Sequence, residues 1–146
     1  MKNRLPTVRQ FMDTGQNTLH ASMPIREAVR FLLSEGMTSA PVLDDMAQVV
    51  GILSEKDCLQ VLTRGDDLPR GTVADYMIKQ VVTITPEMDV YYAAGVFLKN
   101  AFRRLPVTEN GRLIGQLTRR DILRAIELNL DADERLKLRV GLHGSD

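Results

Sequence analysis

The sequence is poor in cysteine, in tryptophan and in charge of one sign. Its single cysteine, Cys58, excludes an internal disulfide and a zinc site of the CxxC type. Lys plus Arg and Asp plus Glu both number 19, so a general affinity for polyanions is not expected. The sequence contains no apolar segment of signal-peptide or membrane-spanning length, and we therefore expect a cytoplasmic protein without a membrane partner.

What the sequence does contain is an internal repeat. The segment TVRQFM at 7–12 corresponds to TVADYM at 72–77, at an offset of 65 residues, and a PV dipeptide recurs at the same offset. The offset falls to 64 between GILSEKD at 51–57 and GQLTRRD at 115–121, which predicts a surface turn that is one residue longer in the first unit. The repeat divides the chain into a first unit at 5–65, a linker at 66–71, a second unit at 72–128, and a C-terminal helix and tail at 129–146.

Each unit has the pattern of a short leading helix followed by β-α-β-β-α, which predicts an α+β fold. Thr7 and Thr72 are placed to cap the leading helices. The long helix of each unit carries apolar residues at i, i+3, i+4, i+7 and i+8, the stripe of a helix buried on one side. The stripes consist of Ile25, Ala28, Val29, Leu32 and Leu33, and of Val90, Ala93, Ala94, Phe97 and Leu98. Because one unit of this size is marginal alone, we expect the two to pack sheet to sheet as one pseudo-twofold body.

Other elements follow from the same pattern. The β-branched run at 81–85 predicts a strand more clearly than its counterpart at 18–21 does. The closing helices begin at the hydroxyl residues of the two Gly-containing motifs, and we expect them to turn Leu62 and Ile126 inward. The segment at 131–141 predicts a further helix outside the repeat.

Two equivalent tetrapeptides carry the candidate chemistry: Ser54 with Asp57, and Thr118 with Asp121. A hydroxyl residue followed three positions later by an acid is also the pattern of a capping box. That motif favours Glu or Gln at its last position, whereas both units use the shorter Asp, which favours a ligand role. A hydroxyl at a helix N-terminus suits a phosphate, and a carboxylate can accept hydrogen bonds from the two hydroxyls of a ribose. The two roles are compatible, and the residues alone allow both.

The tandem units, each with PV entering a strand and then Gly-x-x-(Ser/Thr)-x-x-Asp, resemble a CBS (cystathionine β-synthase) domain pair, also called a Bateman module. The resemblance covers about residues 5–128. It implies a stand-alone regulatory module that binds AMP, ADP, ATP or another adenosine-containing ligand between the units and signals to a regulated partner protein. We expect no enzyme activity, no metal, and no cofactor other than an adenine nucleotide as a regulatory ligand.

The resemblance also implies roles for particular residues. It assigns the ligand phosphate to Ser54 and Thr118 and the ribose to Asp57 and Asp121. The adenine is expected beside the strand ahead of the long helix and beside the residues that lead into PV. The implied ligand-binding residues are Thr18, Ser39, Ala40, Ser54 and Asp57 in the first unit, and Thr83, Arg103, Arg104, Leu105, Pro106, Thr118 and Asp121 in the second.

The two units differ in the charge of equivalent stretches. The stretch 99–124 carries seven basic and two acidic residues, whereas the matching stretch 34–60 carries one basic and five acidic residues. Arg103 and Arg104 immediately precede LPV, where the resemblance brings side chains to the phosphates, and the forked donors of arginine suit phosphate. The first unit has Thr38 and Ser39 at the matching positions, so we expect the first site to lack a cation there. We therefore expect the site built on Thr118 to prefer phosphorylated adenosine.

We also expect a homodimer, because Val8, Phe11, Val73 and Tyr76 form apolar helix faces that a two-unit body leaves uncovered. The serious alternative function is a ligand-free dimerisation and interaction scaffold. An enzyme is the weakest interpretation, since no nucleophile–base pair is evident. Nucleic-acid binding is not favoured, because the basic second unit lacks interleaved aromatic residues. His20 has no second His or Cys in register, so no metal site is expected.

Overall fold

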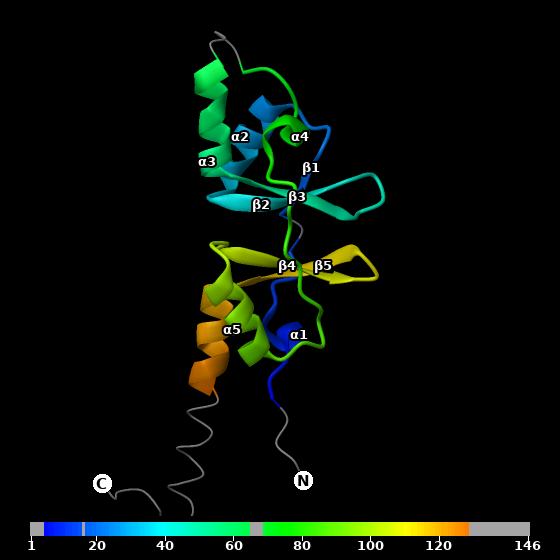
Figure 1. Cartoon of the computed structure of the whole chain (residues 1–146), viewed down its shortest axis with the longest axis vertical. Coiled ribbons are helices and arrows are strands. Elements are labelled where there is room, and N and C mark those ends of the chain that lie inside the picture. The colour runs from blue at the N-terminus through cyan, green and yellow to red at the C-terminus, as the bar shows by residue number, and fades with distance from the viewer. Residues whose placement is uncertain (1–4, 16, 65–68, 129–146) are drawn as a thin grey trace, which may run out of the picture.

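The computed structural model describes residues 5–15, 17–64 and 69–128 as two lobes stacked along the long axis (Figure 1). The first half of the chain forms α1 (Val8–Phe11), β1 (Leu19–His20), α2 (Ile25–Glu35), β2 (Ser39–Leu43), β3 (Val49–Ser54), α3 (Glu55–Leu59) and the 3-10 helix η1 (Gln60–Arg64). The second half forms α4 (Val73–Tyr76), α5 (Val90–Lys99), β4 (Arg104–Glu109), β5 (Arg112–Thr118) and a helix over 119–128. The sheets face each other at the middle of the body and the helices lie toward its ends, which confirms the predicted α+β fold class.

The helices are short. α2 has 11 residues and α5 has 10. The N–H groups of Thr7 and Thr72 donate to the side chains of Gln10 and Asp75 at 2.9 and 2.8 Å, so both threonines begin their helices as predicted. No helix among the described residues is both long and apolar enough to cross a bilayer. The cytoplasmic location stays a prediction, and the helix expected at 131–141 lies outside the described residues.

The two sheets differ at one edge. In the first lobe β1 pairs in parallel with β2, and β2 pairs antiparallel with β3. In the second lobe β4 pairs antiparallel with β5, and an isolated bridge at Ile84 replaces the edge strand, so the expectation of a clearer strand at 81–85 is wrong. The N–H of Ala21 extends the first ladder by donating to Leu43 O at 3.0 Å. Its repeat counterpart is Pro86, which has no N–H to donate.

The two hairpin turns differ where the repeat offset changes. In the β4–β5 turn, Asn110 and Gly111 have φ angles of 55° and 81°, the left-handed pair of a tight hairpin turn. The β2–β3 turn is longer, and Asp44 Oδ1 accepts hydrogen bonds from the N–H groups of Met46 and Gln48 at 2.8 and 2.9 Å. The additional residue therefore lies in a surface turn, as predicted.

Each lobe completes its core with the leading helix of the other half of the chain. Val8 of α1 is fully buried in the second lobe, where its N–H donates to Met88 O at 2.8 Å. Val73 of α4 is fully buried in the first lobe, where its N–H donates to Met23 O at 2.8 Å. The folded cores are thus not identical with the sequence units, whose boundaries stay a prediction.

This exchange overturns the expectation that the leading helices leave apolar faces uncovered. Val8, Val73 and Tyr76 are buried, and Phe11 is half-buried against the core of the second lobe. The crossing of the chain between the lobes supplies the cover that the linear repeat does not indicate. These helix faces therefore give no reason to expect a dimer, and the homodimer stays a prediction.

Gly51 and Gly115 allow the crossing segments to lie against β3 and β5. A Cβ atom added to Gly51 would come within 2.9 Å of Ile78 O, and one added to Gly115 within 3.0 Å of Asp13 O. Both distances leave too little room for a side chain beside a backbone carbonyl. The two repeat-equivalent glycines therefore have the same role: each allows a crossing segment to pack closely against a strand.

The long helices bear out part of the predicted stripes. The buried members are Ile25, Ala28 and Leu32 of α2 and Val90, Ala93 and Phe97 of α5. Leu33 and Leu98, which end the two stripes, are 77% and 88% exposed. Leu62 and Ile126, also expected inside, are 80% and 37% exposed. The apolar stripe is wider than the surface that each helix buries, so repeat-equivalent apolar residues remain outside both lobes.

Candidate functional site

The chain passes from strand to helix at Ser54 and forms a closed capping box there. The Ser54 N–H and hydroxyl both donate to Asp57 Oδ2 at 2.8 Å, and the Asp57 N–H donates to Ser54 Oγ at 3.3 Å. Asp57 is only 6% exposed. Its carboxylate is therefore committed to the first turn of α3.

The equivalent turn at Thr118 has the same backbone bonds and an additional ion pair. The Thr118 N–H donates to Asp121 Oδ2 at 2.7 Å, and the Asp121 N–H donates to Thr118 Oγ1 at 3.2 Å. The other carboxylate oxygen of Asp121 pairs with the guanidinium of Arg124, about one helical turn further along. Both oxygens of this buried carboxylate thus have protein partners.

Aspartate therefore closes the capping box in both halves, although the motif favours Glu or Gln. The extended backbone at Ser54, with φ −117° and ψ 167°, brings its N–H within reach of the shorter side chain. The inference that Asp instead of Glu favours a ligand over a cap is wrong. The capping role of Asp57 and Asp121 is structural, and their contact with a ribose stays a prediction.

One cleft opens between the lobes beside the end of β3, and we call it the Ser54 cleft. It has a volume of about 370 Å³. Its lining consists of Thr38, Ser39, Ile52, Ser54, Glu55 and Lys56 from the first half of the chain and Ile78, Ala101, Phe102, Arg103 and Arg104 from the second. Three of these side chains are cationic and one is acidic, so the cleft favours an anionic ligand.

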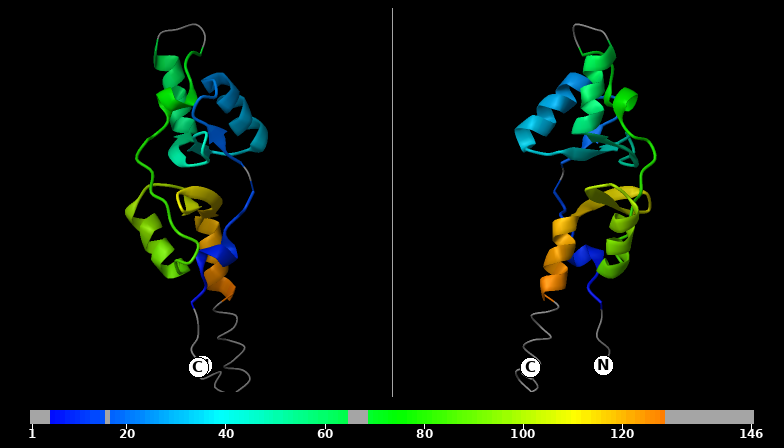
Figure 2. Two further views of the ribbon diagram at one scale, coloured as in Figure 1. Left: turned by 90° about the vertical axis from the view of Figure 1, so that its right-hand side faces the viewer. Right: turned by 60° about the vertical axis from the view of Figure 1, so that its left-hand side comes forward.

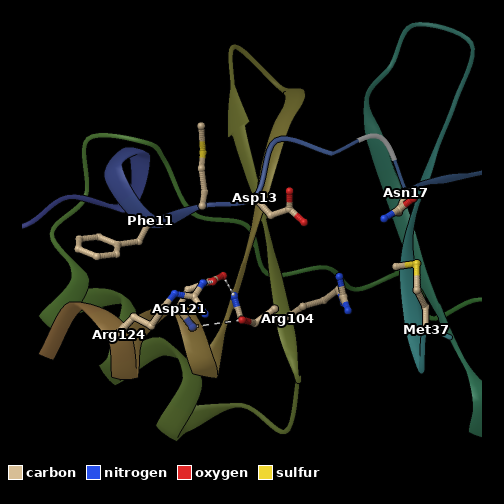
Figure 3. A pocket seen from close by; sticks show the side chains of 9 residues that line it. Phe11, Asp13, Asn17, Met37, Arg104, Asp121 and Arg124 are labelled. Atoms are coloured by element: carbon tan, nitrogen blue, oxygen red, sulfur yellow. Dashed lines mark hydrogen bonds and ion pairs between the residues drawn. The ribbon is translucent and has the colours of Figure 1, made fainter. Parts of the chain in front are cut away.

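A second cleft lies beside the end of β5, and we call it the Thr118 cleft (Figure 3). It has a volume of about 450 Å³ and is lined by Phe11, Met12, Asp13, Asn17, Met37, Arg104, Thr118, Asp121 and Arg124. Two of these side chains are cationic and two are acidic, so its charges balance. Figure 3 shows the Arg104 side chain extending from β4 toward Asn17 and Met37.

The clefts have repeat-equivalent walls of opposite polarity. In the Ser54 cleft, Ile52 and Ile78 exchange two backbone hydrogen bonds of 3.0 and 2.9 Å and present apolar side chains. Their counterparts, Gln116 and Asp13, exchange the same two bonds at 2.9 and 2.8 Å. Asp13 lines the Thr118 cleft, and Gln116 is 3% exposed behind it. The same backbone frame therefore places an apolar side chain, Ile78, at one cleft and an acidic one, Asp13, at the other.

Arg104 is the least exposed cation of the two clefts. Its Nη1 donates to Gln116 Oε1 at 2.8 Å. Burial lowers the pKa of Arg104, and the carboxylates of Asp13 and Asp121 act against that lowering. Its Nε is fully buried and has no hydrogen-bond partner among the described residues. A buried donor without a partner costs free energy until an acceptor reaches it.

Arg103 lies in a different cleft from the one expected. The linear charge pattern groups it with Thr118, but it lines the Ser54 cleft together with Thr38 and Ser39. The loop ahead of LPV extends across the boundary between the lobes, so Arg103 contributes its charge to the cleft beside Ser54. The expectation that the first site lacks a cation is therefore wrong. The linear sequence does not show that this loop extends from one lobe to the other.

Of the twelve residues predicted to bind a ligand, the clefts bring together Ser39, Ser54 and Arg103 on one side, and Thr118 and Asp121 on the other, with Arg104 in both. The remaining six line neither cleft: Thr18, Ala40, Asp57, Thr83, Leu105 and Pro106. Ala40, Leu105 and Pro106 are buried within strands, and Thr83 is exposed elsewhere. A ligand role for these six stays a prediction.

Sequence reasoning missed the lining residues that cross between lobes. Asp13 and Ile78 are equivalent in the repeat, and so are Met37 and Phe102, each pair at the offset of 65 residues. Each pair divides between the two clefts. The repeat indicates their equivalence, but their position at a cleft depends on how one lobe faces the other.

A Ser-His-Asp arrangement also occurs, away from the clefts. His20 Nδ1 accepts hydrogen bonds from the Ser22 hydroxyl at 2.8 Å and the Ser22 N–H at 3.0 Å, and His20 Nε2 lies 2.7 Å from Asp45 Oδ1. The expectation that no nucleophile lies beside a base is thus wrong. The Asp45 side chain is 93% exposed, and none of the three residues lines either cleft. The bond to the Ser22 N–H identifies the arrangement as the stabilisation of a surface turn.

Comparison with known proteins gives a consistent family match. The family model described as CBS domain matches the chain twice, over residues 8–64 and 73–128. The structure of CBSX2 from Arabidopsis thaliana in complex with AMP is similar, with a TM-score of 0.75 and 30% sequence identity over 86% of this chain and 98% of that one. These matches cover both lobes.

Two curated relatives are longer proteins. The protein MJ1225 of Methanocaldococcus jannaschii is 30% identical over 119 residues, which are 82% of this chain and 42% of that protein. The A-adding tRNA nucleotidyltransferase of Aquifex aeolicus is 29% identical over 124 residues, which are 85% of this chain and 15% of the enzyme. The chain thus spans less than half of the length of either relative.

Proposed function

The chain belongs to the CBS domain family, and on that premise we propose that it is a regulatory module that binds an adenosine nucleotide in the clefts between its lobes. The AMP bound by CBSX2, a structure 30% identical to this chain, supports the ligand class. A bound nucleotide contacts both lobes and thereby changes how they present their surfaces to a regulated partner protein. The match to 15% of a nucleotidyltransferase gives no support for enzyme activity in this chain.

The Ser54 cleft is the observation that carries this proposal. It joins residues of both lobes around a hydroxyl, an apolar wall and three cations. An adenine ring suits the wall formed by Ile52 and Ile78, while Lys56, Arg103 and Arg104 suit a phosphate. We therefore assign the phosphorylated ligand first to the Ser54 cleft, the reverse of the assignment made from the linear charge pattern.

Binding of AMP is tested by titration calorimetry and by the melting temperature of the native chain. At an AMP concentration 100 times the dissociation constant, linkage stabilises the folded state by about 2.7 kcal/mol. Adenosine binds more weakly than AMP, because it has no phosphate for the cations of the Ser54 cleft. A melting temperature unchanged by AMP, ADP and ATP would instead favour a ligand-free scaffold.

Arg103→Ala sharpens the same test. It removes one charge-assisted contact to the phosphate, worth about 1.5 kcal/mol at this exposed position, or roughly a tenfold loss of AMP affinity. Binding of adenosine stays the same. Arg112→Ala is the matched control, since Arg112 is an exposed arginine of the same lobe that lines neither cleft. Equal losses for the two variants would show that only the general charge of the second lobe matters.

We further propose that two copies associate through the outer helix surface. Its exposed apolar residues are Leu33, Leu59 and Leu62 in the first lobe and Leu98, Leu123 and Ile126 in the second, and they form three repeat-equivalent pairs. α3 and the helix over 119–128 lie on one side of the body, one above the other, as Figures 1 and 2 show. A second copy related by a twofold axis covers such a surface in both lobes at once.

Light scattering tests the dimer. Leu98→Glu converts the native dimer to a monomer, because it places a charge in a buried apolar interface. Met46→Glu is the control, since Met46 is 63% exposed in the β2–β3 turn and lies away from the helix surface. A native chain that is monomeric at micromolar concentration contradicts the proposed association.

A further inference from the structure

The two clefts share one side chain. Arg104 lines both, and no other described residue does. It begins β4, where the backbone passes between the clefts, so its long side chain lies on their common boundary. Two ligands that bind at the same time therefore meet the same guanidinium.

The present partner of this guanidinium is weak and replaceable. Arg104 Nη1 bonds to a neutral amide oxygen of Gln116, and no ion pair within 4.0 Å holds it among the described residues. Its buried Nε donates to nothing in the described part of the chain. Hydrogen bonds to a charged acceptor are about twice as strong as those to a neutral one. A phosphate within reach would therefore replace Gln116 as the partner.

The clefts depend on Arg104 to different degrees. The Ser54 cleft retains Lys56 and Arg103 as cations if Arg104 turns away. The Thr118 cleft retains only Arg124, which is already paired with Asp121, and it also contains the carboxylate of Asp13. Without Arg104, a phosphate in the Thr118 cleft faces uncompensated negative charge.

Resting on the proposed nucleotide binding, we propose that Arg104 is a single anion-binding group shared by the two clefts, so that a phosphorylated ligand in the Ser54 cleft weakens binding of a second one in the Thr118 cleft. The first phosphate recruits Arg104 and leaves the second site with its acidic residues. An unphosphorylated adenosine in the Ser54 cleft does not recruit Arg104 and has no such effect.

Methyl NMR on the native chain reads the clefts separately. Ile78 reports the Ser54 cleft and Met37 reports the Thr118 cleft. A second protein, Ile78→Trp, fills the Ser54 cleft with an uncharged ring at a position that is 43% exposed, so that AMP reaches only the Thr118 cleft. AMP and adenosine are titrated into both proteins, with and without Arg104→Gln.

With AMP, the Met37 midpoint moves to about tenfold lower concentration in Ile78→Trp than in the native chain, a shift typical of coupled sites. With adenosine, or in the Arg104→Gln background, the midpoint does not move. The double variant Lys56→Ala, Arg103→Ala provides an independent measurement if Ile78→Trp does not fold, because both side chains are exposed and line only the Ser54 cleft. It weakens AMP binding in the Ser54 cleft and frees Arg104, so the Met37 midpoint for AMP again falls, and in the Arg104→Gln background it does not.

Two outcomes overturn the proposal, and they are distinguishable. If both methyl signals respond to AMP but the Met37 midpoint is the same in the native chain and in the variants that fill or weaken the Ser54 cleft, the clefts are independent and nucleotide binding stands. If neither signal responds to AMP or adenosine, the proposed function and the sharing of Arg104 fail together.

Discussion

The Ser54 and Thr118 clefts are built from the same duplicated frame and differ in what faces the ligand space. Each ends a strand in a capping box, and each is bordered by a crossing segment held by two backbone hydrogen bonds. At equivalent positions, however, Ile78 lines the Ser54 cleft and Asp13 lines the Thr118 cleft. The comparison teaches that the duplication preserved the residues that hold the frame and varied those that line the clefts.

The largest effect is expected where the frame is least tolerant. Gly51→Ala lowers the free energy of unfolding by about 3 kcal/mol and Gly115→Ala by about 2 kcal/mol, because each Cβ meets a backbone carbonyl of a crossing segment. Urea denaturation measures both. Gly95→Ala is the control: nothing lies within 4 Å of its added Cβ, and alanine in a helix is neutral or stabilising. A tolerated Gly51→Ala would show that the two crossings are not equivalent.

The capping boxes come next. Asp121→Ala and Asp57→Ala each lower the free energy of unfolding by about 2 kcal/mol, since each leaves an N-cap N–H without its acceptor. Asp57→Asn retains an acceptor oxygen and loses less. Thermal denaturation without ligand separates this structural role from any contact with a ribose. Stability unchanged by both alanine variants would contradict the capping role.

A smaller effect is expected from the polar wall of the Thr118 cleft. Asp13→Asn removes one of the two acidic groups of that cleft. The Gly15 N–H donates to Asp13 Oδ1 at 2.9 Å, and the amide oxygen of asparagine can accept the same bond. AMP affinity in this cleft, followed at the Met37 methyl, rises about threefold, the range of an exposed charge interaction. Adenosine affinity stays constant. A rise for both ligands would assign the effect to something other than charge.

The smallest effect concerns Cys58, whose repeat counterpart is Ile122. Burial raises the pKa of the Cys58 thiol, and the charges of Asp57 and Glu55 add to the rise. Because the folded-state pKa lies above the unfolded value, this contribution to stability is complete below the usual thiol pKa of 9.0 and is lost as the pH rises beyond it. Cys58→Ile gives both lobes the same residue and flattens the alkaline decline, which denaturation at pH 7 to 10 measures.

Much of the fold could be predicted from the sequence, because the repeat and the helix periodicity depend on local spacing. The caps at Thr7 and Thr72 and the turn at Asn110 and Gly111 are local in the same sense. The width of the buried stripe was not predictable. Periodicity identifies an apolar face, but it does not say whether Leu33 finds cover within its own chain.

The candidate site was predictable only in part. The motif residues Ser54 and Thr118 do border clefts, because a hydroxyl at a strand end is fixed by local structure. Arg103 was assigned to the wrong cleft, since its position depends on how one lobe sits on the other. Asp13 was missed for the same reason: it reaches the Thr118 cleft only because α1 crosses to the second lobe.

The exchange of α1 and α4 also constrains the order in which the chain acquires structure. As the chain leaves the ribosome, the first lobe cannot complete its core before Val73 and Tyr76 emerge. The second lobe needs Val8 in its core, although Val8 emerges long before the rest of that lobe. The bond from the Val8 N–H to Met88 O closes a loop of most of the chain, and contacts of such long sequence separation slow folding. The first lobe can therefore complete its core once α4 has emerged, whereas the second lobe needs both Val8 and residues as late as Ile122.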